Sequence, residues 1–211
     1  MNPRSLTLTA LALTTTAACT LLSGCWDSAD AQTPVFTLTS ADIPAGSTIA
    51  NTHVLNGFGC SGQNISPALS WTNPPAGTLS YSITVYDPDA PTGSGFWHYS
   101  VHNIPGTTTS LARGAMNGTG TMPAGIHTAI NDFQDTGTTG GNGNWGGPCP
   151  PVGDTPHRYI FKIYALDVAD MAVAAGIPKT GTAAVHGFAL SRAGLGTHVL
   201  GTASFEARYG R

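Results

Sequence analysis

Asp87 is a carboxylate at the end of an apolar, strand-like segment. It follows residues 79–86, in which apolar residues occupy every second position. The two-residue repeat of a β-strand places Asp87 on the same side as those apolar residues. A carboxylate at the edge of a core costs free energy unless it is hydrogen-bonded or paired. We therefore expect Asp87 to have partners, either in a binding site or in a structural hydrogen-bond network.

Histidines occur in two further strand-like segments. His157 begins the segment 157–166 and shares one face with Tyr159, and the same alternation in 97–104 places His98, Ser100 and His102 on one face. His98 and His102 are four residues apart but lack the His-Glu-x-x-His pattern of a helical zinc site. We expect no metal and no other cofactor.

Catalysis is a weaker interpretation of the same side chains. His98 or His157, oriented by Asp87, could serve as the general acid or base of a hydrolase. The sequence offers no credible nucleophile, no Gly-x-Ser-x-Gly elbow and no P-loop. Gly141-x-Gly143-x-x-Gly146 matches the dinucleotide fingerprint but is followed by prolines rather than a helix. We expect no catalytic residue.

Short alternating segments separated by turns must position these side chains. Strand-like segments cover residues 35–38, 79–86, 97–104, 157–166 and 203–209, and short helices are expected within 167–178 and 180–200. The 27 Gly and 15 Pro residues favour strands and turns over a helix bundle. With neither an internal repeat nor a second domain boundary, we expect one mainly β domain over residues 35–211.

The N-terminus has the pattern of an export signal. Arg4 precedes a short apolar run that ends in Leu22-Ser23-Gly24-Cys25, which resembles a bacterial lipobox. We predict a signal peptide over residues 1–24, a lipid-bearing Cys25 and a tether over 25–34; an ordinary signal cut nearby is the alternative. The expected location is the cell envelope, with a lipid anchor facing the periplasm or the outer surface.

Charge and cysteine content narrow the class further. Charged residues make up 9% of the chain, and its 8 Lys and Arg residues form no cluster, which excludes a nucleic-acid partner. Once Cys19 leaves with the signal and Cys25 is lipidated, Cys60 and Cys149 remain. Two leftover cysteines in an exported protein usually form a disulfide, and two buried free thiols are the alternative.

Two long segments resemble a known family. Residues 87–99 read DPDAPTGSGFWHY, and residues 147–159 read GPCPPVGDTPHRY. Together they resemble the signature segments of the phosphatidylethanolamine-binding proteins, in particular the bacterial Raf-kinase-inhibitor-like branch. The resemblance covers most of residues 55–170 and the ending Tyr209-Gly210-Arg211, but residues 171–197 match poorly.

The resemblance implies a two-sheet antiparallel β-sandwich with a few short peripheral helices and a small anion pocket. Carried over onto this sequence, the pocket residues are Asp87, Pro91, Trp97, His98, Pro151, His157 and Tyr159. Imidazoles and a phenol donate hydrogen bonds to phosphoryl oxygens, whereas Asp87 would repel a dianion. A protonated ligand oxygen or an ammonium group would remove that conflict.

We expect an exported protein that binds a small anion or a phosphoryl head group and is not an enzyme. The alternative is an inhibitor of a protease or of another envelope enzyme, which would act through protein–protein contact.

Overall fold

A computed structural model describes residues 34–116, 124–134, 145–191 and 196–211. The signal peptide, the tether and Cys25 lie outside these residues, as does most of the glycine-rich segment 136–148. No helix in the described ranges is long and apolar enough to cross a membrane.

The larger sheet has five antiparallel strands in the order β10-β9-β5-β6-β8. It consists of β5 (Ser80–Asp87), β6 (Phe96–Pro105), β8 (His127–Thr128), β9 (His157–Leu166) and β10 (Val199–Tyr209). Strand β5 lies at its centre, with Ile83 opposite Ile163 of β9 and Val101 of β6. The long strands therefore arise where the sequence alternates most clearly.

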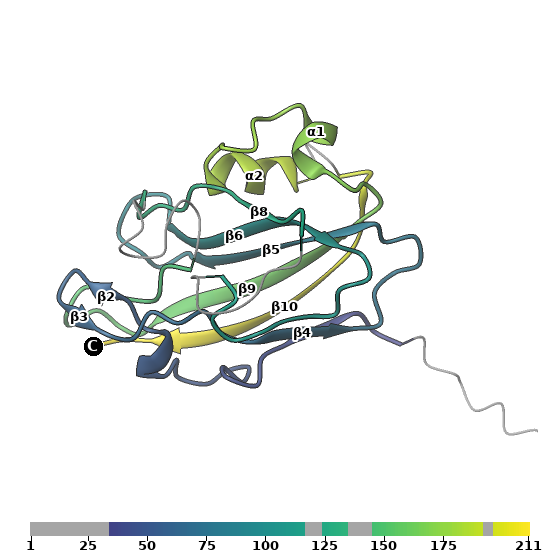
Figure 1. Cartoon of the computed structure of the whole chain (residues 1–211). Coiled ribbons are helices and arrows are strands. Elements are labelled where there is room, and N and C mark those ends of the chain that lie inside the picture. Colours follow the sequence, from purple (N-terminus) through teal and green to yellow (C-terminus); the bar gives the residue numbers. More distant parts are fainter. Residues whose placement is uncertain (1–33, 117–123, 135–144, 192–195) are drawn as a thin grey trace, which may run out of the picture. The chain divides into compact units, whose positions relative to one another are not determined.

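Two smaller sheets complete the β structure. A three-stranded sheet in the order β1-β4-β7 contains β1 (Thr37–Thr39), β4 (Leu69–Thr72) and β7 (Ser110–Leu111). A hairpin pairs β2 (Asn56–Gly57) with β3 (Cys60–Ser61) and lies near the end of β10 in Figure 1. A 3-10 turn, Asn51–His53, precedes the hairpin.

The main core lies between the three-stranded and five-stranded sheets. Trp71 of β4 contacts Tyr81 of β5 edge-on, with 5.2 Å between ring centroids. Phe161 of β9 stacks on Phe205 of β10 at 4.6 Å. Such side chains bury most of the apolar area that stabilises the fold. The expectation of a mainly β, two-sheet antiparallel sandwich is confirmed.

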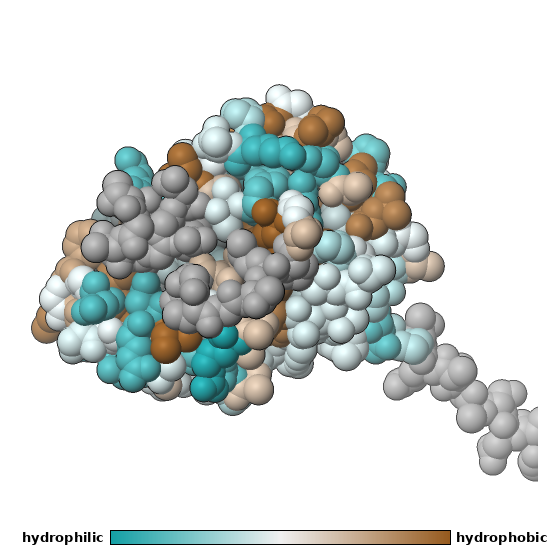
Figure 2. Space-filling model, in the orientation of Figure 1, coloured by the Kyte–Doolittle hydropathy of each residue, from teal (hydrophilic) through white to brown (hydrophobic). Residues whose placement is uncertain are grey.

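Two short helices, α1 (Met171–Ala175) and α2 (Ala183–Ala189), lie on the other face of the large sheet (Figure 1). Asp170 caps α1 and Thr182 caps α2, each accepting hydrogen bonds from the first free backbone N–H groups. Because α2 buries only one stripe against the sheet, Phe188 stays 64% exposed. Figure 2 shows apolar and hydrophilic atoms side by side on the surface over the helices.

Strand β6 departs from simple alternation at His98. Its register against β5 passes from Val85↔Tyr99 to Tyr86↔Trp97, which leaves one extra residue in β6. A bulge of this kind turns two successive side chains toward the same face. His98 and Tyr99 both face the core, and the prediction that His98, Ser100 and His102 share a face is wrong.

Candidate ligand-binding site

A cavity of about 310 Å³ opens where β5 ends and where β6 and β9 begin. Six of the residues predicted for the pocket line it: Asp87, Pro91, His98, Pro151, His157 and Tyr159. They come from segments far apart in the sequence, which the large sheet brings together. The size suits a small molecule or a head group.

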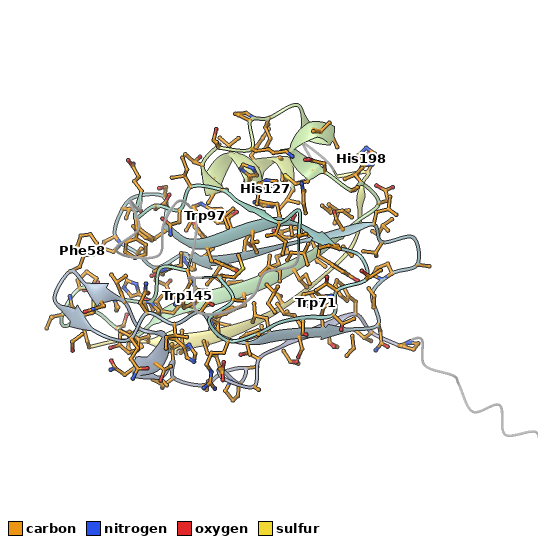
Figure 3. All side chains as sticks on the ribbon, in the orientation of Figure 1. Phe58, Trp71, Trp97, His127, Trp145 and His198 are labelled. Atoms are coloured by element: carbon orange, nitrogen blue, oxygen red, sulfur yellow. A yellow bond between two sulfur atoms is a disulfide. The ribbon has the colours of Figure 1, made fainter. Side chains whose placement is uncertain are left out.

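Trp97, the seventh predicted residue, does not line this cavity. It is the neighbour of His98 in β6 and therefore points to the opposite face of the strand, toward α2 (Figure 3). Its ring packs on Tyr86, with 4.6 Å between centroids, and a Cβ added to Gly187 of α2 would lie 2.7 Å from it. The physical reason for the correction is strand alternation: Phe96 and His98 both line the cavity, so Trp97 between them faces the other way.

The Asp87 carboxylate has a complete set of partners. Its Oδ2 atom lies 2.7 Å from Nδ1 of His157, and its Oδ1 atom accepts the backbone N–H groups of Asp89 and Ala90 at 2.8 and 3.1 Å. The second ring nitrogen of His157 lies 3.3 Å from Oδ2 of Asp154. Asp87 thus places a carboxylate in the cavity wall and orients His157.

His98 presents a hydrogen-bond acceptor to the cavity. Its Nδ1 atom lies 2.8 Å from the carbonyl oxygen of Gly146, which can only accept, so the proton is on Nδ1. Burial lowers the pKa of His98 to about 4, against smaller opposing effects from the Gly146 carbonyl and Asp87. The ring is therefore neutral at pH 7, and its buried Nε2 atom has no hydrogen-bond partner in the described structure.

Tyr159 presents a donor beside it. Its ring lies edge-on to His98, with 5.1 Å between centroids. Burial, and then the negative charge of Asp87, raise the pKa of the phenol, so it keeps its proton. The hydroxyl is near Asp87, but within the described ranges it makes no hydrogen bond of normal geometry.

The rim of the cavity holds residues that the sequence did not assign to the pocket. Arg211 donates from Nε to the Pro150 carbonyl at 2.6 Å and from Nη2 to the Phe58 carbonyl at 3.2 Å. Because both acceptors are neutral, its guanidinium brings a positive charge to the rim. The signature ending Tyr209-Gly210-Arg211 was the one signal that could have pointed to it.

Aromatic side chains form the rest of the rim. Phe96 and Phe133 contact each other edge-on at 4.7 Å, and Phe58 lies 5.9 Å from Phe133. Phe58 is 73% exposed and has a positive φ of 50°, a backbone region that bulky residues rarely adopt. Figure 3 shows it at the end of the molecule that carries β2 and β3.

A disulfide fixes one wall of the cavity. Cys60 of β3 and Cys149 are bonded, the pairing expected from the sequence, and Cys149 itself lines the cavity. The bond ties the hairpin that carries Phe58 to the Pro150-Pro151 wall. In the described parts of the chain, no cluster of His, Cys, Asp or Glu side chains is arranged to hold a metal ion.

These polar groups can bind and orient an acid group. Comparisons with known proteins identify the family to which the fold belongs. A family model described as phosphatidylethanolamine-binding protein matches residues 26–209. The chain belongs to the phosphatidylethanolamine-binding protein family. It is 47% identical to the UPF0098 protein YbcL of Escherichia coli strain K12. The aligned 144 residues are 68% of this chain and 75% of YbcL.

The crystal structure of E. coli YbcL has the same fold. It aligns with a TM-score of 0.70 at 40% identity, over 83% of this chain and 98% of that one. Another relative is the putative lipoprotein LppC of Mycobacterium tuberculosis strain H37Rv. It is 38% identical over 112 residues, or 53% of this chain and 48% of LppC.

In this phosphatidylethanolamine-binding protein, the described residues of the weakly matching segment, 171–191 and 196–197, do not form a wall of the cavity. None of its described residues lines the cavity, and α1 and α2 lie across the large sheet from the main core. The residues after β10 contribute to the cavity instead, through Arg211.

Proposed function

We propose that this protein binds small ligands carrying a phosphoryl or similar acid group, in the cavity between Asp87, His98, His157 and Tyr159. The observation that carries the proposal is the pair of buried, unpartnered polar atoms, His98 Nε2 and Tyr159 Oη, in one cavity. Buried polar groups without partners cost free energy, so they are uncommon unless something else occupies the site.

The surrounding groups suit a ligand with both acceptors and donors. Tyr159 can donate to a ligand oxygen, and Arg211 places a positive charge at the rim. Asp87 favours a ligand that also carries a proton or an ammonium group. A zwitterion such as phosphoethanolamine meets both conditions, and the aromatic rim can cover the apolar part of a larger molecule.

We propose further that the protein acts at the cell envelope, held by a lipid on Cys25. The lipobox-like segment 22–25 and the likeness to the putative lipoprotein LppC support this location. The disulfide between Cys60 and Cys149 supports an oxidising compartment, because such bonds persist mainly in exported proteins.

Ligand binding can be tested by NMR on residues 26–211, which contain both sheets and the whole described core. Phosphate, phosphoethanolamine and acetate are titrated while the histidine ring resonances are followed. We expect saturable shifts of His98 and His157. His102, on the opposite face of the sheet, is an internal control that should not move.

The substitution His157→Ala should abolish the shift of His98. If no ligand moves either ring at millimolar concentration, the cavity is not an anion site. The search then turns to protein partners such as an envelope protease.

The anchor is tested separately in cells with Cys25→Ser. Wild-type protein should incorporate labelled palmitate and sediment with membranes, whereas the variant should do neither. Equal labelling of both proteins would contradict the predicted lipidation site.

A further inference from the structure

Two residues that line the cavity carry an unpartnered donor and an unpartnered acceptor. Tyr159 Oη and His98 Nε2 are both buried, neither has a partner in the described structure, and their rings are 5.1 Å apart. Their roles follow from their surroundings. The Gly146 carbonyl fixes the His98 proton on Nδ1, which leaves Nε2 as a lone pair.

Tyr159 remains the donor and His98 the acceptor at neutral pH. Burial holds the pKa of His98 near 4, and burial with the Asp87 charge raises that of Tyr159, so neither group changes state between pH 5.5 and 8.5. The other titratable groups facing His98 are Asp87 and His157. Asp154 lies behind His157, and Arg211 is at the rim.

A ligand with acceptor atoms alone fits this arrangement badly. A fully deprotonated anion would satisfy Tyr159 but would place a lone pair against Nε2 of His98. The fixed charge of Asp87 would also repel it, because its carboxylate lines the same cavity. A ligand with both an acceptor oxygen and an O–H or N–H group would satisfy both atoms.

We propose that His98 makes the cavity selective for acid groups that carry a proton. The preferred ligands are inorganic phosphate or a phosphate monoester in the monoanionic form, whereas sulfate and phosphodiesters without a donor are rejected. This inference rests on the proposed function, because it assumes that acid groups bind in this cavity. His98 is then a specificity-determining residue, since it accepts the ligand's proton-bearing oxygen.

The discrimination should be large. A site built to hydrogen-bond a ligand O–H rejects analogues without it, because its own buried polar atoms are left unpaired. We expect sulfate to bind at least about tenfold more weakly than phosphate at pH 7. Phosphate monoesters lose their second proton near pH 6. Their apparent affinity should therefore fall about tenfold for each pH unit above that value.

Calorimetric titration of residues 26–211 tests this with inorganic phosphate, sulfate and dimethyl phosphate from pH 5.5 to 8.5. Phosphate should bind, sulfate and dimethyl phosphate should bind much more weakly, and phosphate affinity should decline as pH rises. The nitrogen-15 resonance of His98 Nε2 should remain that of an unprotonated acceptor in the complex. Equal affinities for sulfate and phosphate, or phosphate affinity independent of pH, would overturn the inference.

The variant His98→Phe removes the acceptor, and the ratio of phosphate to sulfate affinity should then fall to within about threefold. If this variant does not fold, the affinities of the wild-type protein for phosphate and sulfate still test the selectivity. A cavity that binds none of the three anions at any pH would overturn the proposed function, whereas binding without discrimination would overturn only the selectivity.

Two sources could supply a phosphate monoester. Soluble glycerol phosphate represents a free metabolite, and vesicles of phosphatidylcholine with phosphatidic acid represent a lipid head group. Binding of either one supports the proposed selectivity and identifies the source. Equal binding to vesicles of phosphatidylcholine alone, whose phosphodiester carries no donor, would contradict it.

Discussion

Oδ2 of Asp87 lies 2.7 Å from Nδ1 of His157, and both side chains are only 3% exposed. The contact joins the end of β5 to the start of β9, which are adjacent strands at the cavity. Because Oδ1 of Asp87 also accepts two backbone N–H groups, the carboxylate supports the adjoining turn as well as the site. The pair therefore links the stability of this end of the sheet to ligand binding.

Replacing Asp87 should damage both stability and binding. Asp87→Asn places an amide N–H₂ where an oxygen now accepts hydrogen bonds, and leaving a buried donor unsatisfied costs about 1–3 kcal/mol. We expect a loss of that size in urea unfolding and loss of phosphate binding. Asp89→Asn is the matched control, because Asp89 forms a partly exposed ion pair with Arg158. It should cost under about 1 kcal/mol and preserve binding.

Replacing Tyr159 should affect stability and binding in opposite directions. Tyr159→Phe removes a buried hydroxyl without a partner, so the free energy of unfolding should stay the same or rise by up to about 1 kcal/mol. Phosphate affinity should fall about tenfold, or about 1.4 kcal/mol. Tyr81→Phe, whose hydroxyl donates to the Gly106 carbonyl at 3.4 Å, should leave affinity unchanged. An unchanged phosphate affinity in the Tyr159→Phe variant would show that the phenol does not bind the ligand.

Breaking the disulfide should loosen the cavity wall. The Cys60→Ser/Cys149→Ser double variant loses a bond that closes a loop with a sequence separation of 89 residues. The chain-entropy model gives a loss of about 4.6 kcal/mol. Urea unfolding should show a lower midpoint, and the affinity for phosphate should decrease because Cys149 lines the cavity. Wild-type protein treated with dithiothreitol should behave like the variant; an unchanged midpoint in both would contradict a structural role.

Three histidines on the opposite face, of which His102 and His186 are buried and His127 is half-buried, should make stability depend on pH. His102 stacks on His186 at 4.4 Å, and His127 lies 5.4 Å from His102. Burial lowers the pKa of all three rings. The charged groups that act on His127 are Asp170 and Lys179, which form a salt bridge with each other.

The unfolded chain therefore binds more protons than the folded one below about pH 6.5, and the free energy of unfolding should fall as pH drops from 7 to 5. Asp89 and Asp170, whose pKa values are about 2, lose their contribution only below about pH 4 and do not interfere. In a His127→Gln/His186→Gln variant the decline should be smaller. A decline of the same size in the variant would exclude His127 and His186 as its cause.

The position of Trp97 can be tested through Gly187. An exposed helical Gly→Ala change usually stabilises a protein by about 0.5–1 kcal/mol. Gly187→Ala should instead destabilise this one, because the added Cβ would lie 2.7 Å from the Trp97 ring. Ligand affinity should not change, since Trp97 faces α2 and not the cavity. Val185→Ala, an exposed change in the same helix, is the control.

The long strands were predictable because their alternation is strong. The segments 79–86, 97–104 and 157–166 coincide with β5, β6 and β9 to within one or two residues. Strands of two residues, such as those of the β2–β3 hairpin, are too short to show any period and were missed. The helix expected within 180–200 is confined to Ala183–Ala189, in keeping with the glycines that follow.

The site was predictable where it depends on signature residues and not where it depends on geometry. Motif positions such as Asp87 and His157 lie on the cavity, because strand ends place them there. Trp97 lies away from the cavity because it alternates with Phe96 and His98, which both line it. Phe58 and Arg211 reach the rim through contacts between segments far apart in the chain, which local patterns do not encode.

A crystal structure of residues 26–211 soaked with phosphoethanolamine tests the central claim most directly. The phosphoryl group should occupy the cavity, with oxygens about 2.7–3.2 Å from His98 Nε2 and Tyr159 Oη. A ligand ordered only in the groove lined by Lys162 and Tyr164, or a cavity still empty at saturating concentration, would contradict the account.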